Sequence, residues 1–253
     1  MISTESLSVV RGGKTILDSV DLRFGTGGIT ALIGPNGAGK STLLHALAGL
    51  LPPNTGCVTV EGRDMARATP QERAKVIALL TQSERVTARL TVADLVGFGR
   101  WPHHRGRPGK ADRHHVDRAL DLFDLSPLAT RHLDTLSGGQ RQRAFTAMAY
   151  AQDTPWLLLD EPLAALDPRF ARDLMERLHA LSRPGPDARS VVVVMHDLSA
   201  AAHYADRIVA LKAGRLMKAG PALLAMTGPM LSDLFGTPLS VETVRGHRLV
   251  API

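Results

Sequence analysis

The first stretch of the chain alternates apolar and polar positions, the pattern of half-buried β-strands. A helix is expected after Gly39, because the four leucines at positions 43–50 fall on one side of a helix. The expected strands cover residues 7–10, 16–24, 29–33, 58–60 and 76–80, and the last two are expected to form a pair.

The spacing of apolar residues becomes typical of helices from about residue 85 to residue 150. Beyond it, two short apolar runs at 156–160 and 191–195 indicate strands that are buried on both faces of a parallel sheet. A helix expected at 170–181 lies between these runs, so the three elements form a βαβ unit. One helical face in the middle region follows the spacing i, i+3, i+4, i+7 through Val116, Ala119, Leu120 and Phe123.

The pattern weakens toward the end of the chain. Two further strands are expected at 208–211 and 215–218, and the tail from Pro221 has little periodicity. Two segments, 101–111 and 183–187, are rich in turn-forming residues and are expected to be loops.

Composition narrows the class of protein. With 253 residues, 44% of them apolar, the chain suits one large α/β domain or two small ones. No apolar run is long enough to span a bilayer, and the N-terminus lacks the basic and apolar parts of a signal peptide. Cys57 is the only cysteine, which excludes an intrachain disulfide and fits a reducing compartment. The net charge of +6 suits a nucleotide, a nucleic acid or an anionic membrane face, and equally a solvated surface.

A glycine-rich segment between an expected strand and an expected helix fits the phosphate-loop pattern G-x-x-x-x-G-K-[ST]. Its backbone N–H groups and the helix N-terminus favour phosphate oxygens. Lys40 would reach the β- and γ-phosphates of ATP, and the Ser41 hydroxyl would hold Mg²⁺. The residues expected to bind the nucleotide here are Gly34, Pro35, Asn36, Gly37, Ala38, Gly39, Lys40, Ser41 and Thr42.

A second element is the apolar run that ends in Asp160 and Glu161. Asp160 is placed to hold magnesium, and Glu161 is placed as the general base that polarises the attacking water. Alone, this pattern is usually just a strand end. Together with the phosphate loop it indicates hydrolysis of ATP.

Between these two elements stands Leu136-Ser137-Gly138-Gly139-Gln140, and His196 follows the last buried strand. In this order, with Gln82 upstream and Ala165-Leu166-Asp167 downstream, the motifs over residues 5–220 resemble those of the ABC ATPase family. The resemblance implies an α/β fold: a P-loop NTPase core with an N-terminal antiparallel β subdomain and an inserted α-helical subdomain. It implies one domain over residues 1–253, with the core at 1–84 and 152–220, the helical signature subdomain at 85–151 and a C-terminal tail at 221–253.

The resemblance also implies roles for individual residues. Gln82 would sense magnesium, His196 would contact the γ-phosphate and hold Glu161 and water in line, and Asp167 would contact the opposite subunit. Ser137, Gly138, Gly139 and Gln140 would bind the γ-phosphate of an ATP held by a second copy, so the active form would be a head-to-tail dimer.

Two positions depart from the family pattern. Arg11 stands where an aromatic residue usually stacks on adenine, and a guanidinium can also stack on a flat ring. Ala164 stands where Ser or Asn is more usual, which removes a polar contact at the dimer seam.

The segment at residues 90–100 resembles the importer ATPases for iron siderophores, haem and cobalamin. The residues in and around it look most like those of ferric-siderophore uptake ATPases. Haem or cobalamin import remains the alternative. An ABC ATPase of DNA repair or translation is less favoured, because the chain has one cassette and no coiled-coil insertion. The implied partners are a membrane permease that docks on the helical subdomain and, indirectly, a substrate-binding protein; no nucleic acid is expected. The chain would lie at the cytoplasmic face of the membrane, as a peripheral subunit.

Overall fold

The structure, a computed structural model, describes residues 1–81, 89–164 and 166–253. Its centre is a sheet with the strand order β10-β9-β3-β8-β7-β6. Neighbouring strands from β9 to β6 run parallel, and β10 is antiparallel at the edge. The strands are β3 (Ile29–Ile33), β6 (Ile77–Leu80), β7 (Trp156–Asp160), β8 (Ser190–Val194), β9 (Arg207–Lys212) and β10 (Arg215–Pro221).

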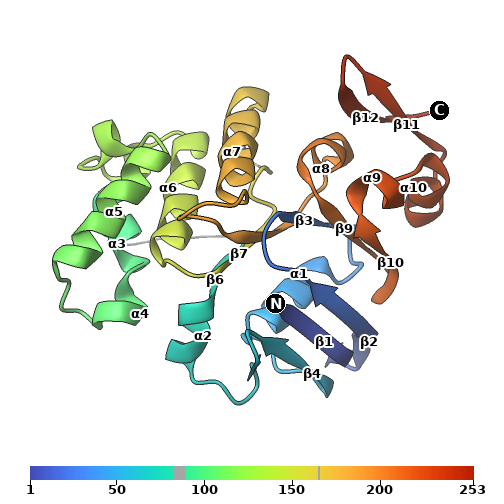
Figure 1. The fold of residues 1–253 in the computed structure, drawn as a ribbon, viewed down its shortest axis with the longest axis horizontal. Coiled ribbons are helices and arrows are strands. Elements are labelled where there is room, and N and C mark those ends of the chain that lie inside the picture. The colour runs from blue at the N-terminus through green and yellow to red at the C-terminus, as the bar shows by residue number, and fades with distance from the viewer. Residues whose placement is uncertain (82–88, 165) are drawn as a thin grey trace.

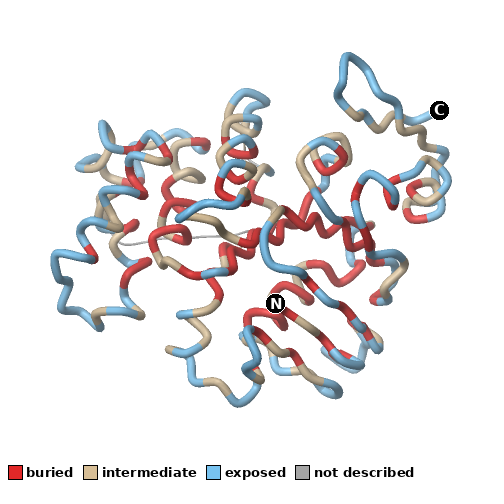
Figure 2. The backbone as a smooth tube through the Cα atoms, in the orientation of Figure 1, coloured by how far each residue is buried: buried red, intermediate tan, exposed pale blue. Residues whose placement is uncertain are grey.

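Both faces of this sheet are covered, which explains the uninterrupted apolar runs of its strands. On β7, Leu157 and Leu159 pack into one core and Leu158 packs into the other. The first core lies against α7 (Pro168–Leu181) and α8 (Leu198–Tyr204), and the second lies against α1 (Lys40–Leu47). The expected βαβ unit is confirmed as β7-α7-β8. Figure 2 shows the buried backbone running through these central strands.

A separate antiparallel sheet of order β2-β1-β4-β5 packs on the α1 side (Figure 1). Its strands are β1 (Ile2–Arg11), β2 (Lys14–Phe24), β4 (Thr55–Val60) and β5 (Arg63–Asp64). The expected pairing of residues 58–60 with 76–80 is wrong, because β4 belongs to this sheet and β6 to the central one. The physical reason is helix α2 (Pro70–Val76), whose Thr69 capping box and Pro70 start a helix between the two strands.

The helical region forms a group of helices beyond the β6 edge of the central sheet (Figure 1). It contains α3 (Val92–Phe98), α4 (Trp101–His104), α5 (Lys110–Leu122), α6 (Gly138–Ala151) and the short 3₁₀ turns η1 (Ser126–Leu128) and η2 (Leu133–Thr135). The expectation of a loop at 101–111 is therefore only partly right, since α4 lies inside it and α5 begins at Lys110. None of the described helices is long and apolar enough to cross a bilayer.

The tail after Pro221 is folded, although its sequence shows little periodicity. It forms α9 (Ala222–Ala225), α10 (Gly228–Phe235) and the hairpin β11 (Leu239–Val244) with β12 (His247–Pro252). Leu231 and Leu234 of α10 are buried, and the backbone N–H of Val250 donates to Ser199 Oγ on α8 at 3.0 Å. The elements are too short to give a clear period, and tertiary contacts hold them in place.

A buried ion pair ties the helical region together. Arg100 is 5% exposed, and its Nε donates to Asp112 Oδ1 at 3.2 Å while Nη1 donates to the Ala151 carbonyl at 2.9 Å. The other Asp112 oxygen accepts from the Gly109 N–H at 2.9 Å, and this bond, with Arg100, lowers the pKa of Asp112. One guanidinium thus joins the start of α5 to the end of α6.

We expect Arg100→Leu to lower the free energy of unfolding by about 3–5 kcal/mol, because it leaves the Asp112 carboxylate buried without its partner. Chemical denaturation followed by circular dichroism measures this loss. The matched control is Arg113→Leu at an exposed position of α5, which should change stability by less than about 0.5 kcal/mol. Adding Asp112→Asn to Arg100→Leu should recover part of the loss, and equal losses for Arg100→Leu and the control would contradict the prediction.

Candidate nucleotide site

The phosphate loop links β3 to α1 at the carboxyl end of the central sheet, where ligands bind in open α/β folds. Lys40 begins α1 and is buried, and its ammonium donates to the carbonyls of Gly34 at 2.8 Å and Pro35 at 3.0 Å. These two bonds hold the lysine along its own loop. The pattern-based expectation of a loop between strand and helix is confirmed.

Strand β2 lies directly on this loop at Gly39. Gly39 has a φ of 97°, and a Cβ built there would stand 2.7 Å from Leu17 Cδ2 and 2.9 Å from the Ile16 carbonyl oxygen. Only glycine fits this left-handed and crowded position. The antiparallel sheet is thereby fixed against the phosphate-binding end of the core.

An open cavity of about 680 Å³ lies over the loop. It brings together residues from four parts of the chain: the start of β2, the phosphate loop, the end of β7 and the end of β8. The residues that line it are Lys14, Ile16, Asn36, Gly37, Gly39, Lys40, Ser41, Thr42, Glu161 and His196.

The charges at this site are partly removed from water. Burial lowers the pKa of Lys40, and the carboxylates of Glu161 and Asp160 act against that shift. Burial raises the pKa of Asp160, which is 2% exposed, while the hydrogen bond from Ser41 opposes the rise. Ser41 Oγ donates to Asp160 Oδ1 at 3.1 Å, so one hydroxyl and one carboxylate meet beside the loop.

Glu161 and His196 meet across the carboxyl ends of neighbouring strands. His196 Nε2 and Glu161 Oε1 are 2.5 Å apart. Glu161 has a φ of 51°, a left-handed conformation that is strained for a residue with a side chain and that is often found at functional sites. The backbone at the end of β7 thus turns this carboxylate toward the histidine.

The Leu-Ser-Gly-Gly-Gln motif is not part of this cavity. Ser137 caps α6: its Oγ accepts from Gln140 N at 3.3 Å, and its own N–H donates to Gln140 Oε1 at 3.1 Å. Ser137 and Gly138 are exposed, and Gly139 is buried against Phe170 of α7. The motif is therefore an open helix N-terminus on the helical region, apart from the cavity residues.

The remaining expected residues differ in where they lie. Asp167 is exposed at the start of α7 and does not line the cavity, and Gln82 lies outside the described residues. Arg11 ends β1 at a hairpin tip, whereas Lys14 and Ile16 on β2 line the cavity. Sequence reasoning missed Lys14 and Ile16, because nothing in the local pattern says that β2 crosses the phosphate loop.

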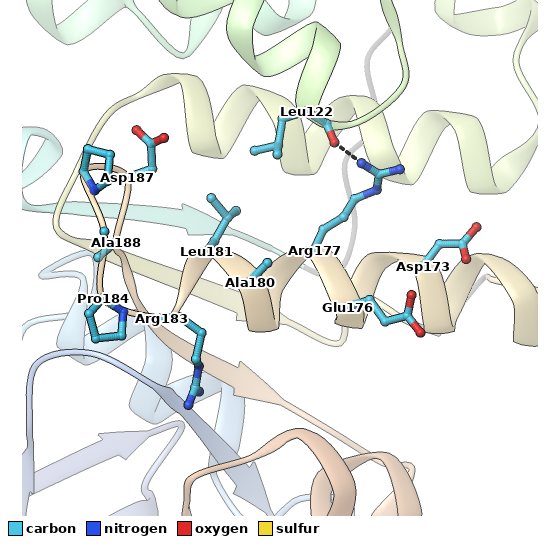
Figure 3. Close-up of a pocket in the computed structure, with 12 residues that line it drawn as sticks. Leu122, Asp173, Glu176, Arg177, Ala180, Leu181, Arg183, Pro184, Asp187 and Ala188 are labelled. Carbon is cyan, nitrogen blue, oxygen red and sulfur yellow. Dashed lines mark hydrogen bonds between the residues drawn. The ribbon is translucent and has the colours of Figure 1, made fainter.

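A second cavity, of about 550 Å³, lies between α7, residues 183–188 and the end of α5 (Figure 3). Arg177 of α7 spans one side and donates to the Leu122 carbonyl, as the dashed line in Figure 3 marks, and also pairs with Asp124. This cavity holds none of the expected site residues. It marks the join between the helical region and the core.

The ABC transporter family profile matches residues 17–164, more than half of the chain. The chain belongs to the ABC transporter family. It is an ATP-binding and ATP-hydrolysing member, and the resemblance and the fold class expected from its motifs are confirmed.

Relatives of known role are similar over almost the whole chain. The petrobactin import ATP-binding protein YclP of Bacillus subtilis is 37% identical, with 98% of each chain covered. The iron(3+)-hydroxamate import ATP-binding protein FhuC of Bacillus subtilis is 36% identical, covering 100% of this chain and 93% of the relative. The hemin import ATP-binding protein HmuV of Pseudomonas aeruginosa is 40% identical, with 99% of each covered.

Solved structures agree with this family. A metal-chelate-type ABC transporter in an inward-facing conformation matches with a TM-score of 0.86 and 27% identity, covering 100% of this chain and 97% of that one. A dimeric ATP-binding cassette in a post-hydrolysis state, bound to ADP and phosphate, matches with a TM-score of 0.78 and 27% identity, covering 88% of this chain and 99% of that one.

We expect Asp160→Asn to stabilise the ligand-free chain at pH 7 by roughly 0.5–2 kcal/mol, because it removes a buried charge while the amide oxygen can still accept from Ser41. The raised pKa of Asp160 means that the folded state keeps this proton to higher pH than the unfolded state. The free energy of unfolding of the parent should therefore fall as pH rises from the unfolded pKa to the folded pKa, and this fall should be missing in the variant.

Denaturation in buffer without nucleotide or magnesium, repeated across pH, measures both effects. Asp117→Asn, at an exposed position of α5, is the control and should change neither the stability nor its pH profile. An Asp160→Asn chain less stable than its parent at pH 7 would contradict the prediction.

Proposed function

We propose that this chain is the ATPase subunit that energises uptake of a ferric siderophore through a separate membrane permease. The observation that carries the ATPase part is the cavity in which the phosphate loop, Ser41, Glu161 and His196 converge. The importer part is supported by relatives that cover nearly the full chain and are named for petrobactin and iron(3+)-hydroxamate import.

The β- and γ-phosphates of ATP would lie on the backbone N–H groups of the loop, at the N-terminus of α1. Lys40 would then exchange its bonds to the loop carbonyls for bonds to phosphate oxygens. A phosphate group would also favour the charged form of this ammonium, whose pKa burial lowers.

The oxygen ligands beside the loop fit magnesium. Ser41 Oγ and Asp160 Oδ1 are 3.1 Å apart, and Mg²⁺ prefers a hydroxyl and a carboxylate of this kind together with phosphate oxygens. A bound cation would also favour the charged form of Asp160, whose pKa burial raises. We assign Ser41 and Asp160, with Gln82 from outside the described residues, to hold the metal, which would neutralise charge on the transferring phosphoryl group.

Glu161 is the proposed general base. Its carboxylate would accept a proton from the water that attacks the γ-phosphorus. The contact from His196 at 2.5 Å keeps the carboxylate on the side of the phosphate loop. His196 would also donate to a γ-phosphate oxygen, so that water, phosphorus and leaving oxygen lie in line.

The signature motif supplies the reason for a dimer. Ser137, Gly138, Gly139 and Gln140 form a helix N-terminus that lies outside the cavity of their own chain, so we propose that they close on the ATP of a second copy. Asp167, exposed at the start of α7, would contact the opposite subunit. The relative solved as a dimeric cassette with ADP and phosphate supports this arrangement.

The helical signature subdomain at 85–151 would receive the permease, and the P-loop core at 1–84 and 152–220 would carry the chemistry, with 221–253 as a tail. Closure and reopening of the dimer would then move the permease. The subunit would lie on the cytoplasmic face of the membrane and act on a substrate-binding protein only indirectly.

Haem import is the second candidate, because a hemin import protein is 40% identical over 99% of the chain.

We expect Glu161→Gln to lower the ATP turnover rate by about 10²–10⁴-fold, because the amide cannot take the proton of the attacking water. ATP binding should persist, and gel filtration with ATP and magnesium should show a stable dimer. Lys40→Ala is the matched comparison and should lose both binding and turnover. If Glu161→Gln turned ATP over at the parent rate, the base assignment would be wrong.

Uptake of radiolabelled ferric siderophores tests the transport role in host cells that carry either the parent or Glu161→Gln as the only copy. We expect the variant to lose uptake of one siderophore class, because its dimer would not go through the closing and reopening that moves the permease. Labelled haem, measured in the same cells, tests the second candidate. Unchanged iron uptake in the variant would rule out siderophore import and leave the ATPase assignment in place.

A further inference from the structure

Two histidines from distant parts of the chain meet where the C-terminal hairpin docks on α8. His203 lies in the last turn of α8, and His247 begins β12, which lies beside α8 (Figure 1). Their Nδ1 atoms are 3.4 Å apart, and their ring centroids are 4.5 Å apart with the planes tilted by 45°. Each imidazole therefore turns the same nitrogen toward the other.

The backbone on both sides of this meeting is fixed. The hairpin turn is Arg245-Gly246, with φ values of 51° and 81°, the positive pair of a tight two-residue turn, and it leads directly into His247. The N–H of Val250 donates to Ser199 Oγ at 3.0 Å, which joins the strand to the helix one turn before His203. The approach of the two rings is thus a consequence of how the tail packs on α8.

The separation of the two nitrogens suits a shared metal ion better than a direct hydrogen bond. Most protein hydrogen bonds join heavy atoms about 2.7–3.2 Å apart. Two imidazole nitrogens that bind one zinc ion at about 2.0–2.1 Å, at the tetrahedral angle, lie about 3.3–3.4 Å from each other. Rotation about χ2 of a histidine has a broad energy minimum, so both lone pairs can turn to one ion.

The surroundings favour the neutral imidazole, which is the form that binds metals. Burial lowers the pKa of His203, and the neighbouring His247 and His179 lower it further. The adjacent cation on β12, Arg248, donates to two backbone carbonyls of the α9 segment at 3.2 and 2.7 Å. Those bonds hold the guanidinium on α9.

An open cavity of about 570 Å³ lies against the pair, between α7, α8 and β12, and both histidines line it. Within residues 1–81, 89–164 and 166–253, no group of three histidine, cysteine or carboxylate side chains is placed to hold an ion. The chain therefore offers two ligands at this point, and the cavity has room for water in the other positions.

We propose that His203 and His247 bind one divalent transition-metal ion, of the zinc type, through their Nδ1 atoms, and that this ion clamps the C-terminal hairpin to α8. Imidazole nitrogens suit zinc, copper, nickel and iron, whereas magnesium prefers oxygen ligands. The site is separate from the nucleotide cavity, whose lining contains neither histidine. It ties the tail to the helix that begins two residues after His196.

Calorimetry on the full chain without an affinity tag tests the site, with zinc chloride as the probe and excess Mg²⁺ present to saturate oxygen-ligand sites. The parent should bind one zinc ion per chain with a Kd of about 1–100 µM, as two protein ligands allow. His203→Ala and His247→Ala should each weaken binding by at least about tenfold, because each removes one of the two ligands. The double variant should be no weaker than either single variant, because the two residues act as a unit.

Hydrogen exchange tests the clamp. Zinc should slow amide exchange in β12 and α8 of the parent and have no such effect in His247→Ala. His114→Ala is the matched control, since His114 is exposed and also lies beside a second histidine, His115, with ring centroids 6.3 Å apart. This control should keep the parent affinity for zinc.

Both members of the pair are exposed, so circular dichroism without zinc should show the variants folded like the parent. A parent that takes up no zinc would overturn the site, as would single variants that keep the parent affinity or a His114→Ala chain that loses it equally. Zinc that binds through the pair but leaves exchange in β12 and α8 unchanged would overturn the clamp.

Discussion

The ammonium of Lys40 and the carboxylates of Asp160 and Glu161 lie close together at the phosphate loop. The protein has to fold with these charged groups partly removed from water. Burial lowers the pKa of Lys40 and raises that of Asp160, so both groups are held where their charged forms are disfavoured. Natural proteins accept such local destabilisation at functional sites. A triphosphate and a divalent cation would complement these charges, so the ligand-free site is organised in advance for its ligands.

The architecture explains how these groups are kept in place. β7 and β8 are short, apolar and covered on both faces, and they place Asp160 with Glu161, and then His196, at the carboxyl edge of the central sheet. The antiparallel sheet closes the site from the other side through the contact of β2 with Gly39. Buried strands therefore position Asp160 and Glu161, whereas His196 and Asn36 are exposed residues of the same site.

The helical region has a different task. Its signature residues form a complete capping box on α6 and are not needed by the cavity of their own chain. Arg100 fixes the end of this same helix to α5, so α5 and α6 are joined as one unit. The tail is also part of the folded body, since β12 packs on α8, which begins two residues after His196. The match to a metal-chelate-type transporter extends over the whole chain, this tail included.

Residues close together in the chain allowed the sequence by itself to predict the phosphate loop, the βαβ unit and the family. These features depend on local backbone geometry, on the spacing of apolar residues and on the order of short motifs. Tertiary structure alone decided that β4 and β6 lie in different sheets, that Arg100 pairs with Asp112, that the tail is folded and that Lys14 with Ile16 lines the nucleotide cavity. Each of these depends on which distant faces are buried against each other, and a period of two or of 3.6 residues carries no information about the partner of a face.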